Sequence, residues 1–457
     1  MTHHREPNRR LAAVIAEAGC TYEALAKAVR AIAAETGGSL RTSKAAVHQW
    51  VAAGAAPAGR TPAYIAEALS RKLNRTVTVA EIGLGHDPAE GAPSHGSMAH
   101  DPLATAADLG RLIMLRRRDL LALTFSTAAV DLPLTYDHGA ASALLRSLTA
   151  GRRVGAHEVV TVRQFTEMFR ATDERLGGGH GLVAVTSYLT DVVTPMLKGT
   201  FATADVRAAA FGAASELANL IGWKLHDTGR EGAAQQVYLL AHQLACEADP
   251  AGHAAWAMRA LAHQALDLGH TRGCVDLAEA ALVRARGKTD RRTEALLLVT
   301  AARAHGATGN GPRAAELILA AEDALLAADD PVPAYAAAAG PPAATLASHT
   351  GRTLTAMNDH TAAERHYRTA LRNRIPRTYH RMRATTLANI AKSVAAQHRA
   401  EEAVALWSKS LDLMDGLDSK RNRHDMHTMR SALAAYARRG IPGAADLARR
   451  ASRVLTT

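Results

Sequence analysis

Apolar and polar residues recur with a helical period along most of this chain. In residues 22–35, the apolar side chains of Leu25, Val29 and Ile32 share one face of a helix that Thr21 can cap. The same kind of pattern predicts four further short helices, over residues 8–18, 44–51, 62–73 and 79–84. Residues 1–85 are therefore predicted to form a compact helical domain.

The rest of the chain repeats a longer unit. Six turn residues follow one another at spacings of 40, 40, 49, 40 and 42 residues: Gly229, Gly269, Gly309, Asn358, His398 and Gly440. Five and twelve residues after each of them stands Ala, Ser or Cys, and in four units a large apolar residue lies between these two small ones. Small residues seven apart share one helical face and allow a partner helix to come close. The pattern predicts helical hairpins that stack into a superhelix.

Two units depart from this pattern. Ala278 and Arg449 stand where the other units have a large apolar residue. Arg449 belongs to the last unit, where a polar outer face is expected of a capping repeat. The pattern does not explain Ala278. The alternative to stacked hairpins is a generic alanine-rich bundle.

The order of the segments defines four regions. A stretch rich in Pro, Gly, Ser and His predicts a linker, and a first helical pair is expected before the clear repeats, within residues 157–200. The glycines of DERLGGGHG, residues 173–181, indicate a helix end and turn, because no Lys-Ser/Thr follows and no strand precedes them. The predicted regions are a helical domain over 1–85, a linker over 86–104, a helical connecting region over 105–200, and a repeat superhelix over 201–457.

The composition of the chain favours one class of binding partner and one cellular compartment. The chain has 457 residues, a net charge of +11 and only 4% aromatic residues, so its core must be built from Ala, Leu and Val. Residues 1–85 alone hold 11 Lys and Arg against six Asp and Glu, which favours a polyanionic partner such as nucleic acid. Three scattered cysteines predict neither a disulfide framework nor a zinc site. With no apolar run long enough for a membrane span, a cytoplasmic protein is expected.

The helices of the first domain follow the order of a repressor-type helix-turn-helix, in which the third helix lies in the major groove. Val47 and Trp50 are expected to face inward and fix this helix. A Gln on the outer face can pair with adenine, a Lys or Arg with guanine or phosphate, and the helix N-terminus attracts phosphate. The residues predicted to contact DNA are Arg41, Thr42, Ser43, Lys44, His48, Gln49 and Arg60. The alternative is a protein-interaction domain with an ordinary basic surface.

Three stretches carry a resemblance to a known family. They are RTSKAAVHQWVAAGAAPAGRTPAYIAEALSRKL with VTVAEIGL within residues 41–84, DERLGGG at 173–179, and ELANLIGWKLHDTGREGAAQQVYLLAHQLA at 216–245. The chain resembles actinobacterial regulators that join a repressor-like helix-turn-helix to tetratricopeptide repeats, with helices longer than that repeat's usual period. The resemblance implies a transcription regulator of development or specialised metabolism. Val51 and Ala52 stand where the family usually has a basic residue after the Trp, so one phosphate contact is in doubt.

A stacked superhelix offers a concave groove for a ligand. The position six residues before each turn is expected to face it, which gives Trp223, His263, Arg303, Arg352, Lys392 and Ala434, and the first five are the candidate effector residues. Cations in this row would attract a carboxylate-bearing peptide, an acidic protein segment or a phosphorylated ligand. The alternative is solvated cations paired with acidic residues of neighbouring helices. A second group, Arg372, Arg374, Arg377, Arg381 and Arg383, indicates either a solvated loop or a further anion contact.

No catalytic motif supports an enzyme. The GKT at residues 287–289 lacks the glycine and the strand of a phosphate loop, and neither HExxH nor G-x-S-x-G occurs. No metal and no cofactor are expected. The sequence thus predicts an all-α regulator that binds double-stranded DNA, forms a homodimer, and holds a peptide, protein or anionic effector in its repeats. The alternative is a tetratricopeptide scaffold without sequence-specific DNA binding.

Overall fold

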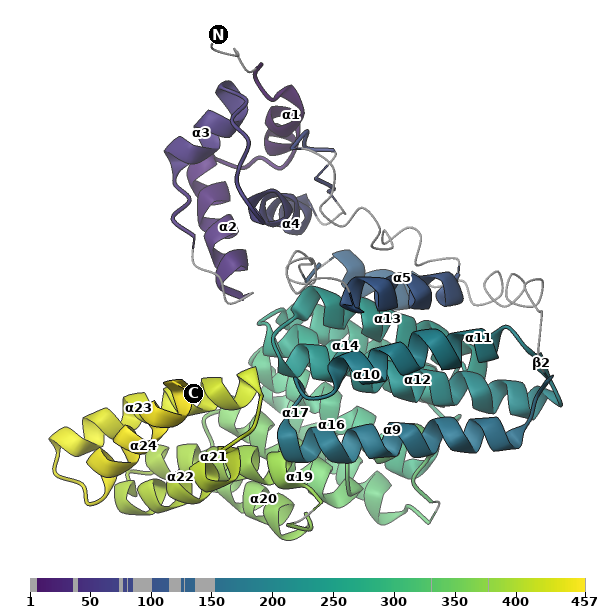
Figure 1. Cartoon of the computed structure of the whole chain (residues 1–457). Coiled ribbons are helices and arrows are strands. Elements are labelled where there is room, and N and C mark those ends of the chain that lie inside the picture. The colour runs from purple at the N-terminus through teal and green to yellow at the C-terminus, as the bar shows by residue number, and fades with distance from the viewer. Residues whose placement is uncertain are drawn as a thin grey trace.

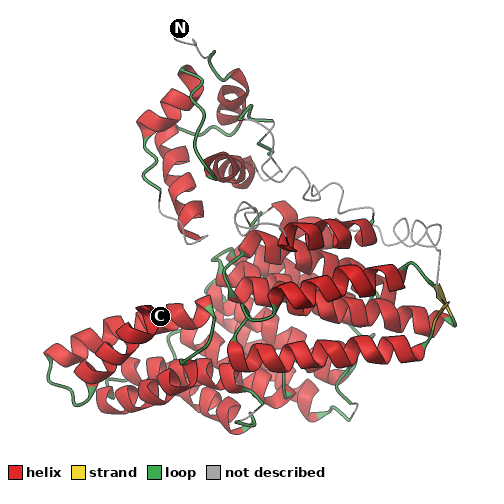
Figure 2. Ribbon diagram, viewed as in Figure 1, coloured by secondary structure: helices red, strands yellow, loops and turns green. Residues whose placement is uncertain are grey.

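The computed structural model describes residues 6–35, 40–73, 77–79, 81–84, 101–114, 125–126, 128–135, 153–329, 331–376 and 378–456. Helices account for most of this part of the chain (Figure 2). The strands in it are β1 (Arg153–Val154) and β2 (Thr200–Phe201), which pair in parallel with Arg153 opposite Thr200. The predicted all-α class is confirmed, as a solenoid-like stack of helices with an N-terminal helical region (Figure 1).

The N-terminal helices have a core of their own. They are α1 (Arg9–Glu17), α2 (Tyr22–Glu35), α3 (Lys44–Ala52) and α4 (Thr61–Leu73). Thr21 and Ser43 cap α2 and α3 as predicted, by accepting the N–H groups of Ala24 at 3.2 Å and Ala46 at 3.3 Å. Leu25, Val29 and Ile32 are buried between the helices, also as predicted.

The prediction of a fifth helix in this domain, over residues 79–84, is wrong. Residues 79 and 81–84 form turns, with the Ile82 N–H donating to the Thr78 carbonyl. Gly83 has a φ of +64°, which an α-helix does not accommodate. Asn8 holds this turn against α1, because its side-chain amide donates to the Ile82 carbonyl at 2.9 Å while its oxygen caps α1.

The connecting region packs onto the solenoid. Most of the expected linker lies outside the described residues, and α5 (Pro102–Met114) begins inside its last three residues. Next come a 3₁₀ turn, η2 (Ala128–Asp131), and a short helix, α7 (Leu132–Thr135). Leu103, Leu109 and Phe125 belong to the main solenoid core. The Gln235 side chain fixes this region further, by accepting the Ser126 N–H at 2.7 Å and donating to the Ser126 carbonyl at 2.6 Å.

The first helical pair lies where the sequence placed it. It consists of α9 (Ala156–Leu176) and a second arm of α10 (Leu182–Ser187), the π-helical η3 (Tyr188–Val193) and α11 (Thr194–Leu197). The stretch from Asp173 to Gly181 is a helix end and turn, because α9 ends at Leu176 and the Gly177 N–H donates to the Asp173 carbonyl. The predicted helix end is confirmed.

Six hairpins follow. They are α12 (Ala204–Asp227) with α13 (Glu231–Ala248), α14 (Gly252–Asp267) with α15 (Thr271–Ala285), α16 (Arg291–Ala307) with α17 (Gly311–Leu326), α19 (Pro342–Ala356) with α20 (His360–Arg372), α21 (His380–Ala396) with α22 (Ala400–Met414), and α23 (Lys420–Arg438) with α24 (Ala444–Thr456). All six predicted turn residues have a positive φ, between +64° and +84°. Each therefore ends its first helix in the left-handed conformation that reverses the chain.

The small residues predicted to pack across each hairpin are buried in the first five units. The last unit differs, because Ala444, Leu447 and Ala451 are buried there while the predicted Ala445 is exposed. Helix α24 begins four residues after Gly440, whereas each of the other five begins two residues after its turn residue. The longer turn rotates α24, so Arg449 lies on its exposed side and fills no core position.

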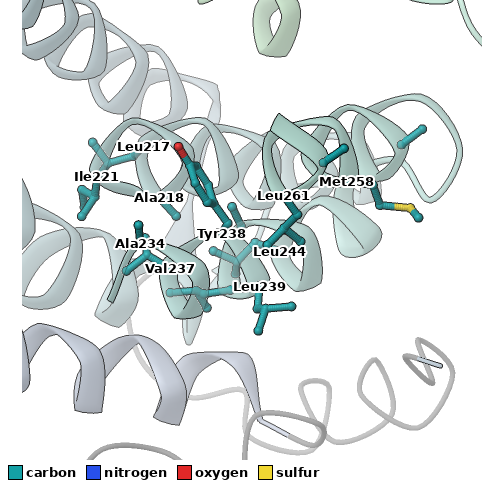
Figure 3. Packing of buried hydrophobic residues seen from close by; sticks show 14 of the residues in the cluster. Leu217, Ala218, Ile221, Ala234, Val237, Tyr238, Leu239, Leu244, Met258 and Leu261 are labelled. Carbon is teal, nitrogen blue, oxygen red and sulfur yellow. The ribbon is translucent and has the colours of Figure 1, made fainter. Parts of the chain in front are cut away.

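Glycines inside two first helices allow a large partner residue across the hairpin. A Cβ on Gly222 would lie 2.6 Å from the Tyr238 ring, and one on Gly351 would lie 2.7 Å from the Tyr367 ring. Figure 3 shows Tyr238 within the cluster formed by Leu217, Ala218 and Ile221 of α12 and by neighbouring helices. In these two units the missing side chain of the glycine makes room for the ring of the tyrosine. Ala278 is buried in the second hairpin, and the structure does not explain why a small residue stands there.

Candidate functional site

The exposed face of α3 is the first candidate site. Arg41, Ser43, Lys44, His48 and Gln49 are exposed along it, and we call these five residues the α3 surface. The opposite side of the helix is held by Val47, Trp50 and Val51, which are buried in the N-terminal core. The structure therefore places five of the seven predicted DNA contacts side by side on one short helix and its N-terminus.

The other two predicted contacts lie in different surroundings. Thr42 is 7% exposed, and its carbonyl accepts a hydrogen bond from the Arg30 guanidinium of α2. Arg60 lies over the ring of Tyr64, with 5.1 Å between the guanidinium carbon and the ring centroid, and burial lowers its pKa. Val51, one of the two residues that replace the basic residue usual in the resembled family, is a core residue.

The comparison with known protein families gives a match in the N-terminal domain. Residues 11–85 match the family described as the SP15 N-terminal domain. No curated protein matches the chain. The matched segment covers α1 from Leu11 onward and all of α2, α3 and α4, and therefore includes the whole α3 surface.

The second candidate site is a cavity of about 350 Å³ inside the solenoid, which we call the chamber. Its walls come from the first helices of all six hairpins, from α9, and from α18 (Ala334–Ala337). Four of the five candidate effector residues line it: Trp223, His263, Arg303 and Arg352. Lys392 does not, and its ammonium group instead forms an ion pair with Asp425 of α23 at 2.5 Å. For Lys392 the structure thus shows the alternative, a cation paired with a neighbouring helix.

One part of the chamber gathers more positive than negative charge. Arg303 contacts Asp267 at 2.6 Å, and Arg421 contacts the same carboxylate at 3.1 Å. Arg259 and Arg352 lie nearby, and neither forms an ion pair with a carboxylate of the described residues. Four arginines therefore share one carboxylate, and we call these five residues the arginine cluster.

Burial and neighbouring cations raise the free energy of the charged arginines in the arginine cluster. Burial, together with the nearby Arg303, lowers the pKa of Arg259 to about 9 and that of Arg352 to about 10. His263 and His349 stack with 4.8 Å between their ring centroids, and burial holds the pKa of both well below the usual value. Both imidazoles are therefore uncharged at neutral pH and can each donate one hydrogen bond and accept another.

Oppositely charged groups balance one another at the α9 side of the chamber. Arg381 of α21 donates to Asp173 at 2.9 Å and to Glu174 at 2.7 Å, and Lys224 of α12 lies 3.4 Å from Asp173. All four side chains are buried, and we call them the α9 ion cluster. They join helices more than 150 residues apart in the sequence, so the superhelix closes on itself here.

The three glycines after α9 complete this closure. A Cβ on Gly178 would lie 2.8 Å from the Lys224 carbonyl oxygen, and one on Gly179 would meet the Asp418 carboxylate. The Gly178 N–H donates to Asp227 at 3.0 Å, and the Gly179 N–H donates to the Asp418 carbonyl at 3.2 Å. The glycines thus let the end of α9 approach both α12 and the loop before α23.

The spacing of 49 residues between Gly309 and Asn358 includes an additional segment. This segment forms another wall of the chamber. It contains α18, whose Tyr335 stacks on His253 with 4.7 Å between ring centroids and lies 6.1 Å from the Trp256 ring. The Tyr335 hydroxyl lies 3.4 Å from the Thr289 hydroxyl. This segment therefore reaches back from between α17 and α19 to cover the chamber near α14.

The second arginine group is not a solvated loop. Arg374 and Arg381 are each 6% exposed and line the chamber, and Arg374 donates to the Thr386 hydroxyl at 2.6 Å. Arg383 donates to the Leu371 and Arg374 carbonyls, while Arg372 is exposed and Arg377 lies outside the described residues. The acids of α9, far away in the sequence, hold Arg381 inside, while Arg374 is held by the Thr386 hydroxyl.

Sequence reasoning missed several residues of the chamber wall. Arg259 and His349 lie nine or ten residues before their turns, one helical turn before the predicted row. A search of the same helices at intervals of three and four residues would have found them. Tyr335 had a different signal, the longer spacing of its repeat.

Two further findings concern other kinds of site. In the part of the chain that the structure describes, no three His, Cys, Asp or Glu side chains are grouped so that they could hold a metal ion. Among the described helices, none combines the length and the apolar character needed to cross a membrane.

Proposed function

We propose that this protein is a cytoplasmic DNA-binding transcription regulator that acts as a repressor, with an effector site in its solenoid. The observation that carries the proposal is the α3 surface. A short helix fixed by a buried Val and Trp presents a Gln, a Lys, a His and a Ser to solvent, with Arg41 at its N-terminus. These side chains suit base edges and phosphates, and the helix order is that of a helix-turn-helix.

The proposal includes a homodimer and a tetratricopeptide-like repeat region. A single helix-turn-helix reads a short half-site, and two copies joined in a dimer read both halves with greater affinity. The stacked hairpins supply a large body that can join two DNA-binding domains and hold an effector. An effector that favours one shape of this body would change the spacing of the half-sites.

Selection of genomic fragments by the purified full chain tests the proposal, followed by a salt titration on the enriched DNA. We expect one enriched motif whose binding weakens steeply with salt. Lys44→Ala should weaken binding to all fragments and reduce the salt slope by about 1, whereas Gln49→Ala should cost ~1–3 kcal/mol of discrimination at one base pair.

Lys409→Ala is the matched control, because it removes one exposed Lys from α22, far from α3 in the sequence. It should leave the DNA affinity unchanged. If no fragment is enriched, or if the three variants behave alike, the α3 surface does not read DNA. A protein-interaction scaffold would then explain the chain better.

A further inference from the structure

The chamber holds partly buried positive charge that the described residues do not balance. In the arginine cluster, Asp267 is shared by Arg303 and Arg421, so Arg259 and Arg352 have no carboxylate partner among the described residues. Within the described part of the chain, the hydrogen-bond partners of Arg259 are neutral: the Thr300 hydroxyl at 3.0 Å and the His349 imidazole at 3.2 Å. Cations that have lost much of their water are costly unless an anion accompanies them.

Unpaired polar atoms point to the same missing partner. The His349 Nδ1 and the Asn219 Oδ1 are buried and have no hydrogen-bond partner in the described part of the chain, and both residues line the chamber. Arg303 already donates to the His263 Nδ1 at 3.0 Å. A ligand that accepts from the guanidinium groups and from the His349 imidazole would satisfy these donors, whereas the Asn219 Oδ1 requires a ligand group that donates.

Aromatic rings add a flat apolar surface beside the charge. Trp223 and Trp256 both line the chamber. Arg259 lies 4.5 Å from the Trp256 ring centroid, and Arg421 lies 4.9 Å from that of Trp223. Each ring therefore lies beside a guanidinium group that lines the chamber, Trp256 beside Arg259 and Trp223 beside Arg421, and both rings offer contact area for the carbon skeleton of a ligand.

The walls limit the size of the occupant. The α9 ion cluster closes one side and the α18 segment covers another, so the concave surface is a partly open pocket of about 350 Å³. Cavities of roughly 300–1,000 Å³ hold small molecules. A peptide that runs along an open superhelical groove would need α9 and α18 to move away.

We propose that the chamber binds a small organic anion, whose carboxylate or phosphate group lies between Arg259, Arg303 and Arg352 and whose carbon skeleton contacts Trp223 and Trp256. Its identity as the effector rests on the proposed function, whereas its binding does not. The proposal names the class of ligand for the solenoid and replaces the peptide or protein effector with a small molecule.

Calorimetric titration and thermal unfolding of the full chain test this, with citrate, phenyl phosphate, 4-hydroxybenzoate and inorganic phosphate as probes at constant ionic strength. We expect at least one organic probe to bind with a stoichiometry of one per chain and to raise the melting temperature. Arg352→Gln should weaken that binding at least tenfold, while Arg365→Gln, on the outer helix α20, should not. Preference for citrate or for phenyl phosphate tells a carboxylate ligand from a phosphate ester.

The unliganded variants give an independent readout. If Arg352 is a desolvated cation without an ion-pair partner, Arg352→Gln should raise the melting temperature without ligand, and Arg259→Gln should do the same. Equal binding by the wild type and Arg352→Gln, no saturable binding of any organic probe, or binding only of a longer acidic peptide would each overturn the proposal. DNA selection with the same preparations separates the outcomes, because failed DNA enrichment beside intact anion binding contradicts the proposed function alone.

Discussion

The side chains of the α3 surface extend into solvent, whereas those of the arginine cluster lie inside walls built from many segments of the chain. Water solvates the first set, so Arg41 and Lys44 need no protein partner and can bind phosphate at little cost. The second set has lost much of its water, so each cation needs a neighbour to offset its desolvation.

The two regions also differ in how they are built. The α3 surface depends on one helix and on a core formed by residues less than 80 positions apart. The chamber depends on contacts such as that between Glu174 and Arg381, which join segments 207 residues apart. Charge on a local element is thus suited to a docking surface, whereas charge enclosed by a closed superhelix is suited to a small ligand. The predictions below start with the largest expected effect.

Breaking the α9 ion cluster should damage the solenoid most. Arg381→Gln leaves Asp173 with Lys224 as its ion-pair partner and removes the ion pair of the buried Glu174, which should lower the free energy of unfolding by about 3–5 kcal/mol. Urea unfolding followed by circular dichroism measures this. Arg423→Gln is the control, because its ion pair with Asp418 is exposed and should contribute about 1 kcal/mol or less. Similar losses in both variants would mean that the closure contributes little.

Much of the local structure could be predicted from the sequence. The helical period, the small residues and the turns depend on residues close together in the sequence. They therefore located the turns of all six hairpins, the packing positions of five and the buried side of α3 correctly. The same reasoning identified Trp223, His263, Arg303 and Arg352, because a fixed offset from a turn defines one face of a helix. Their common cavity could not be predicted, since it requires the superhelix to close.

The errors arose from interactions between distant residues and from turn length. The arginines at 374 and 381 looked like a solvated loop because the acids that bury Arg381 lie on α9. Thr42 looked exposed at a helix start, but Arg30 of α2 bonds to its carbonyl and the chain covers it. In the last hairpin, two extra turn residues shifted the packing positions by one. None of these effects produces a recurring helical pattern in the sequence.

The charge of His226 should make the solenoid, but not the α3 domain, sensitive to alkaline pH. Burial would lower the pKa of His226, but Glu231 at 2.7 Å and Asp267 at 3.3 Å raise it to about 9. An unfolded histidine titrates near 6.5. Because the folded pKa is the higher one, the stabilisation is complete below pH 6.5 and is lost as the pH rises through 9.

We therefore expect the free energy of unfolding of the solenoid to fall by roughly 2–3 kcal/mol between pH 6.5 and 9.5. Urea titrations at several pH values measure it. His226→Gln should be less stable at pH 6.5 and should flatten the dependence, whereas His424→Gln, an exposed residue of α23, should leave it unchanged. An unchanged slope in His226→Gln would assign the dependence to other groups.

A cavity in the N-terminal core should affect only the α3 domain. Val47 is fully buried, so Val47→Ala should remove about 2 kcal/mol from the stability of this domain. Hydrogen exchange measured by mass spectrometry should show faster exchange in α1 to α4 and unchanged exchange in α12 to α24. Ala45→Ser, on the exposed side of the same helix, serves as the control. Faster exchange in the solenoid would show that the two regions share one cooperative core.

The smallest effect concerns a turn of the solenoid. His398 has a φ of +64°, and Asn358 is the other non-glycine residue with a positive φ among the described residues. A side chain in the left-handed region costs about 1–2 kcal/mol, of which the greater freedom of glycine in the unfolded chain cancels part. His398→Gly should therefore stabilise the solenoid by about 0.5–1 kcal/mol, as measured by urea unfolding. Gly269→Ala, at the equivalent turn with a φ of +84°, should destabilise it by a similar amount, although nothing lies within 4 Å of the added Cβ. Opposite signs in the two variants would show that backbone conformation, rather than side-chain contact, determines the residue at these turns.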